Sequence, residues 1–117
     1  MTAGELVFHI TQVLSFAVAV VKGTERVRYE ALDWQQEVAR FYAMLGELDA
    51  RLAAGARMED GMDLKLVQGP LADALTHVGQ LHAMRRKAGA PIAPTNYIKA
   101  NVQAGRTTLQ DQSDVVG

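Results

Sequence analysis

Hydrophobic residues along the chain form three helical patterns separated by glycines. In the first, residues 7–21 are apolar around most of a helical circumference, and Thr2 and Glu5 have the spacing of a capping box ahead of them. Gly23 suits the left-handed position that ends a helix. The pattern predicts a helix over about 3–22 that is buried on several sides.

The second pattern is a seam of apolar residues at alternating spacings of four and three, sustained over about four heptads. It predicts a helix over about 27–54 that ends before Gly55. Charged residues, Glu37 and Arg40 among them, lie on the opposite face. We interpret the seam as the core face of a bundle helix, with a dimer interface as the alternative. It consists of Val27, Ala31, Trp34, Val38, Phe41, Leu45, Leu48 and Leu52.

The third pattern covers residues 70–88, and the residues at its two ends are typical of helix ends. Gly69 and Pro70 suit the cap and the first position of a helix, because the N–H that proline lacks would be unpaired there. Basic residues at 85–87 offset the negative end of the helix dipole, and Gly89 then suits the stop. Residues 55–69 are left as a long connection.

One shorter helical segment follows. Thr95 is a suitable cap for a helix over about 96–104, which Gly105 would end. The polar residues 106–117 show no period, which predicts a flexible tail. We therefore expect an all-α fold, an antiparallel helical bundle with an up-down-up chain path, in a single domain of residues 1–105.

Composition excludes several classes of function. The chain has no cysteine, which rules out disulfides, thiolate metal sites and cysteine nucleophiles. A net charge of -1 gives no electrostatic basis for binding nucleic acid. The apolar run 7–21 is interrupted by polar residues and is shorter than the about 20 residues that a membrane span needs. The N-terminus lacks the basic side chains of a signal peptide. We expect a cytoplasmic protein without membrane contact.

Three residues are candidates for a metal site. Asp73 and His77 are four residues apart, so they project from one helix face and can share an ion, although such pairs are also common on solvated faces. His9 lies in the second turn of the first helix, either as a core histidine or as a ligand. In an up-down-up path the first and third helices are parallel, and His9 and His77 each lie about 10–12 Å from a helix start. The three side chains can then converge at one level.

Two imidazoles and one carboxylate suit a divalent ion such as zinc, nickel, iron or manganese, with positions left open for water or substrate. Such a site can activate water or polarise an anionic substrate. Gln80 is expected either to support His77 or only to pack. His82 projects about 140° away from His77 around the helix, so we do not expect it to be a ligand.

The run DALTHVGQLHAMRRKAGAPI, residues 73–92, resembles the last core helix of the DinB-like family of metal-binding helical bundles. The run ELVFHITQVLSFAVAVVKG, residues 5–23, resembles the first ligand helix of that family, and NYIKANVQAGR resembles its C-terminal extension. The resemblance implies that His9 and His77 are metal ligands. Asp73 stands where the family has its other helix histidine, and the family's usual first helix has no counterpart in this sequence.

The resemblance also implies a metal-dependent enzyme that acts on a small molecule by thiol transfer, hydrolysis or isomerisation. The alternative is a non-catalytic helical interaction module that has lost metal chemistry. Three helices, one of them apolar almost all round, leave hydrophobic surface exposed, and such surface usually marks a partner. We expect a homodimer, in which a second copy covers the groove that the family's first helix would fill.

Overall fold

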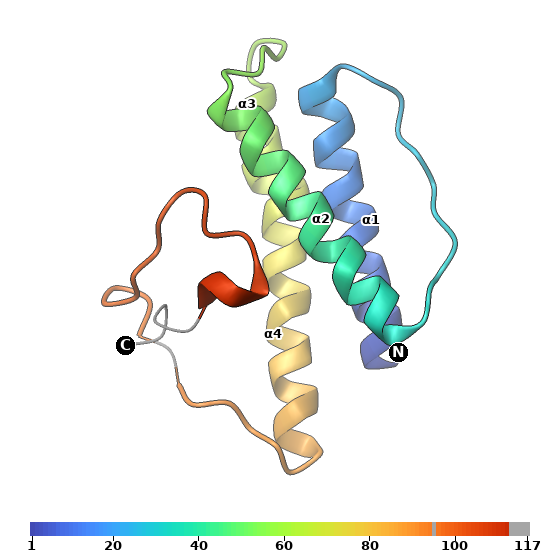
Figure 1. Ribbon diagram of the computed structural model, residues 1–117, viewed down its shortest axis with the longest axis vertical. Coiled ribbons are helices and arrows are strands. Elements are labelled where there is room, and N and C mark those ends of the chain that lie inside the picture. The colour runs from blue at the N-terminus through green and yellow to red at the C-terminus, as the bar shows by residue number, and fades with distance from the viewer. Residues whose placement is uncertain (95, 113–117) are drawn as a thin grey trace.

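The computed structural model describes residues 1–94 and 96–112, and the fold is all-α, as predicted. Its long helices are α1 (Ala3–Lys22), α2 (Trp34–Ala53) and α4 (Ala72–Lys87), and no strand occurs among the described residues (Figure 1). A short helix α3 (Met62–Leu66) and a π-helical turn (Val67–Leu71) lead without a break into α4. A 3₁₀ turn follows at Leu109–Gln112.

The chain path is up-up-down, with α1 and α2 parallel and α4 antiparallel to both (Figure 1). Ala3 and Trp34, at the starts of α1 and α2, line one pocket together with Met84 near the end of α4. At the other end of α1 the ammonium of Lys22 is 3.4 Å from a carboxylate oxygen of Glu47 on α2. The predicted up-down-up path, with the first and third helices parallel, is therefore wrong.

An extended segment, residues 24–33, produces this path and replaces the first turns of the predicted second helix. Helix α1 is about 30 Å long, and ten extended residues span about 33 Å, so the segment returns the chain to the end where α1 began. The side chain of Asp33 accepts a hydrogen bond from the Gln36 N–H and caps α2 at Trp34. The predicted start of the second helix at about residue 27 is wrong. Val27 and Ala31 continue the apolar spacing of α2 by chance, but they lie in the extended segment.

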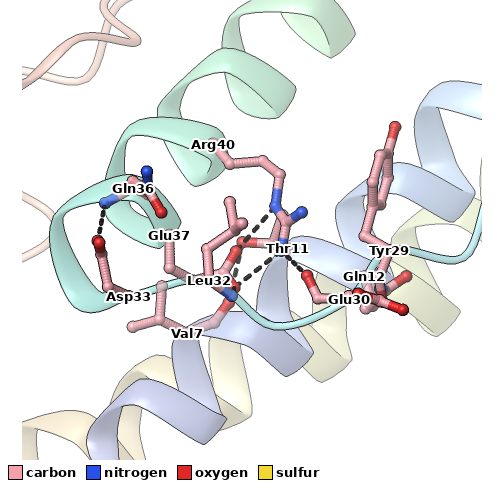
Figure 2. Close-up of polar contacts among 10 residues, drawn as sticks. All are labelled: Val7, Thr11, Gln12, Tyr29, Glu30, Leu32, Asp33, Gln36, Glu37 and Arg40. Carbon is pink, nitrogen blue, oxygen red and sulfur yellow. Dashed lines mark hydrogen bonds and ion pairs between the residues drawn. The ribbon is translucent and has the colours of Figure 1, made fainter.

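A buried carboxylate holds the extended segment against the helices (Figure 2). Glu37 is 1% exposed and accepts hydrogen bonds from the Arg40 guanidinium at 2.8 and 2.9 Å and from the Leu32 N–H at 3.2 Å. Arg40 also donates to the carbonyl of Glu30 at 2.9 Å and lies 4.9 Å from the ring centre of Tyr29. The extended segment therefore covers the part of α2 that carries Glu37 and Arg40.

Helix α1 is the centre of the core, as its apolar composition predicted. It packs against α2, α4 and the π turn, and its buried residues lie on several sides of the helix. The seam of α2 supplies Leu48, which is 4% exposed, with Phe41 and Leu45 packed against the same core. The middle of the seam is thus used inside the bundle, as interpreted, whereas its Val27, Trp34 and Leu52 are 54%, 53% and 43% exposed.

By length and composition alone, α1 is able to cross a membrane. Its 20 residues extend beyond the apolar run of the sequence, so the argument that this run is too short for a span does not hold for the helix. In the folded chain, 56% of the most apolar 18-residue stretch of α1 is buried, as in the core helix of a bundle. The absence of membrane contact stays a prediction.

Helix α3 and the π turn occupy much of the connection predicted over 55–69. Leu66, 4% exposed, anchors α3 in the core and so favours helical structure ahead of Pro70. In a regular α-helix the proline ring would collide with the carbonyl four residues earlier. The π turn avoids this collision, and the Ala72 N–H bonds to the carbonyl of Val67, five residues back. The predicted start at Pro70 is therefore wrong.

The helix predicted over 96–104 does not form; its described residues contain only turns. A short isolated helix is marginal in water, and this segment has little core contact to stabilise one. Three of its apolar side chains are largely exposed: Tyr97, Ile98 and Val102. The predicted cap, Thr95, lies outside the described residues.

The domain limit at residue 105 and the flexible tail over 106–117 stay predictions. Residues 113–117 of that tail lie outside the described residues. Thr107 of the described part approaches α2, with its hydroxyl oxygen 3.6 Å from the position that a Cβ at Gly46 would take.

Arg40→Ala is expected to lower the free energy of unfolding by about 3 kcal/mol, because it leaves the Glu37 carboxylate buried without its cation. Urea denaturation followed by circular dichroism measures this loss. Arg51→Ala is the matched control: its guanidinium is 48% exposed and 3.8 Å from Glu47, so its loss costs at most about 0.5 kcal/mol. Equal losses in the two variants would contradict a special role for the buried pair.

Candidate metal site

The structure brings His9, Asp73 and His77 together between α1 and α4. His9 lies in the second turn of α1, and Asp73 and His77 lie one turn apart at the start of α4. One ligand atom from each residue lies within 4.8 Å of the other two. The three residues selected from the sequence therefore form one cluster that can hold a metal ion.

The route by which the cluster forms differs from the predicted one. The sequence argument placed the two helices parallel, whereas α4 is antiparallel to α1. Because α3 and the π turn extend the helical rod ahead of α4, Asp73 lies near the middle of the rod 62–87. The second turn of α1 packs beside the middle of this continuous helix, so His9 faces Asp73.

Each imidazole of the cluster lies close to one oxygen of the Asp73 carboxylate. His9 Nε2 is 3.2 Å from Asp73 Oδ2, and His77 Nε2 is 3.5 Å from Asp73 Oδ1. The two imidazole rings meet edge to face, with centroids 4.5 Å apart and planes at 83°. Ligands held about 2.0–2.1 Å from a tetrahedral ion lie about 3.3 Å from one another. The carboxylate–imidazole separations match that spacing.

The cluster opens to solvent on one side. The side chains of His9 and Asp73 are 43% and 47% exposed, whereas that of His77 is 18% exposed. His9 is therefore not a core histidine, although the helix that carries it is the most buried element of the fold. An ion held here keeps positions accessible to water or to a small molecule.

Gln80 fixes the orientation of the His77 ring. Its amide oxygen lies 2.7 Å from His77 Nδ1 and can only accept, so in the tautomer that donates from Nδ1 the ring presents a lone pair at Nε2. That lone pair faces Asp73 Oδ1, which is also an acceptor. Two facing acceptors repel unless a cation or a further proton lies between them. This donor set fits a metal ion.

An open groove of about 570 Å³ adjoins the cluster and shares Asp73 with it. Its walls come from α1, the extended segment, the π turn and the first turns of α4. They include Val13, Phe16, Arg26, Gly69, Pro70 and Ala72. Sequence reasoning missed this groove, because its walls come from distant segments and Arg26 lies in a stretch without a recognisable motif.

Comparison of the chain with protein-family models, with curated proteins and with solved structures gave no match. The three-helix fold and the His9–Asp73–His77 group are the features that bear on function. What the protein does is therefore inferred from these residues and their geometry.

Gln80→Leu is expected to weaken the binding of a divalent ion about tenfold, because a ligating histidine loses the partner that orients its ring. Competition with a chromophoric chelator measures the affinity. Gln80→Glu keeps an acceptor beside Nδ1 and should retain most of it. His82→Ala, on the same helix but outside the cluster, should bind as the wild type does. Wild-type affinity in Gln80→Leu would contradict an orienting role for Gln80.

Proposed function

We propose that the protein is a metal-dependent enzyme of the DinB-like kind, with one divalent ion held by His9, Asp73 and His77. The observation that carries the proposal is the Asp73 carboxylate between two imidazole nitrogens, with the amide oxygen of Gln80 beside the other ring nitrogen of His77. The sequence resemblance of residues 5–106 supports His9 and His77, and Asp73 stands where the resemblance would place a histidine. Zinc, nickel, iron and manganese all accept these ligand types.

The residues of the site divide the work of holding and orienting. His77 is the less exposed imidazole, and Gln80 contacts its ring. His9 comes from the other helix, α1, and is the third ligand. Asp73 supplies the negative charge of the ligand set, so a divalent ion there keeps a net charge of about +1 that favours anionic ligands. Bound in this way, the ion supplies Lewis acidity for thiol transfer, hydrolysis or isomerisation of a small molecule.

The first test is the metal content of the purified protein. The wild type is expected to carry about one equivalent of a divalent ion per chain, and His9→Ala and His77→Ala are each expected to lose it, because two remaining ligands hold an ion poorly. Asp73→Asn should weaken binding by removing the charge while keeping the shape. His82→Ala, which alters a histidine outside the cluster, should retain the ion. Elemental analysis after dialysis measures all five proteins.

A folded wild-type protein that contains no metal above background would contradict the enzyme proposal. The three residues would then be only a hydrogen-bonded cluster, and the proposal of a non-catalytic interaction module would replace that of an enzyme. Circular dichroism of the same samples separates loss of metal from loss of fold.

A homodimer and a cytoplasmic location stay predictions. The rod formed by α3, the π turn and α4 exposes large apolar side chains, and surface of this kind usually marks a partner. We propose that a second copy of the chain covers them. They are Leu64, Val67 and Leu75, which are 68%, 61% and 68% exposed.

Sedimentation velocity over a concentration series is expected to give twice the monomer mass for the wild type and the monomer mass for Leu75→Glu, because a charge at this surface opposes its burial. Ile98→Glu, at a turn residue that is 91% exposed, should leave the dimer intact. A wild type that stays monomeric throughout the series would rule out the dimer.

A further inference from the structure

We propose that the groove beside the metal site binds a linear small molecule. Arg26 holds an anionic group at one end of the molecule, and a group at the other end binds the metal ion beside Asp73. The proposal rests on the metal site proposed above and names the class of substrate that this site would take. It follows from the charge, the walls and the length of the groove.

Arg26 is the cation of the groove. Its guanidinium carbon lies 5.8 Å from the ring centre of Phe16, and both residues line the same cavity. In the part of the chain that the structure describes, no carboxylate pairs with Arg26, whereas Glu37 neutralises Arg40. The aromatic face orients the guanidinium and leaves its N–H donors available for a carboxylate or a phosphate.

The walls suit a short hydrocarbon chain between the two charged ends. Val13, Phe16, Pro70 and Ala72 contribute apolar atoms to the groove. At Gly69 an added Cβ would meet no atom within 4 Å, so this part of the wall leaves space for a ligand. A methylene chain is removed from water along these walls, which favours its binding.

Helix α1 sets the length of the molecule. Phe16, which carries Arg26 over its ring, follows His9 by two helical turns, a rise of about 10 Å along the axis. Mercaptohexanoate with its thiol on the terminal carbon has an extended length of about 9 Å at roughly 1.3 Å per bond. A molecule of about this length is therefore a suitable probe for a thiolate at the metal site and a carboxylate at Arg26.

Asp73 makes this binding depend on the ion. Without a cation, its carboxylate would repel an anionic ligand in the same groove, whereas a divalent ion reverses the sign of the local charge. Metal-free protein should therefore not bind the anion, and the loaded protein should.

Cobalt(II)-loaded protein provides the test, since a thiolate on cobalt gives a charge-transfer absorption. Terminal mercaptohexanoate is titrated against neutral mercaptohexanol of the same chain length. The wild type is expected to bind the carboxylate about fivefold more tightly, the contribution of one exposed ion pair. Arg26→Ala should abolish this preference, with unchanged affinity for the alcohol and for cobalt. Arg28→Ala, exposed on the same segment but outside the groove, should keep the preference.

A second variant tests the groove itself. Gly69→Leu adds a side chain where the wall leaves space, and it should weaken the binding of both thiols while cobalt uptake is unchanged. Equal binding of both thiols to the cobalt-loaded wild type, or a preference that survives in Arg26→Ala, would overturn the role of Arg26. Unchanged binding of both thiols in Gly69→Leu would place the ligand outside the groove.

The failure of this proposal is distinguishable from failure of the metal site. The cobalt absorption recorded before any thiol is added shows whether the site takes up the ion. No uptake overturns the metal site and the anion site together. Uptake without a charge preference overturns the anion site alone.

Discussion

The buried ion pair between Glu37 and Arg40 holds the extended segment against α2. A carboxylate that is 1% exposed is stable only with its partners in place, and those partners are the Arg40 guanidinium and the Leu32 N–H of the extended segment. The pair therefore fastens the end of the extended segment to α2. Helix α4 runs antiparallel to α1 and carries Asp73 to His9.

The parts of the fold that the sequence predicted well are those whose signals are local. Thr2 and Glu5 form both hydrogen bonds of the capping box, and Gly23 and Gly89 adopt the left-handed conformation at φ 71° and 85°. The start of α2 was not predictable in this way. The extended segment is held by side chains from other elements, such as Gln12, which donates to the carbonyl of Tyr29 at 2.9 Å. A spacing rule within one segment contains no information about such contacts.

The candidate site shows the same division. Asp73 and His77 could be paired from the sequence because four residues on one helix define their relation, and Gln80 lay close enough to be named. His9 was joined to them by family resemblance and by a chain path that the structure reverses. The exposure of His9 and the presence of Arg26 beside Phe16 depend on how α1, the π turn and the extended segment meet, which only the tertiary structure gives.

The extended segment also separates the ligands into two pieces of chain, His9 before it and Asp73 with His77 after it. His9 and Asp73 are 64 residues apart, so an ion bound by both closes a loop of that size. In chain-entropy terms a cross-link of this length stabilises the folded state by roughly 4 kcal/mol, because the unfolded chain loses conformational freedom. In a chain without cysteine, the bound ion would take the place of a disulfide bond and tie the first helix to the last.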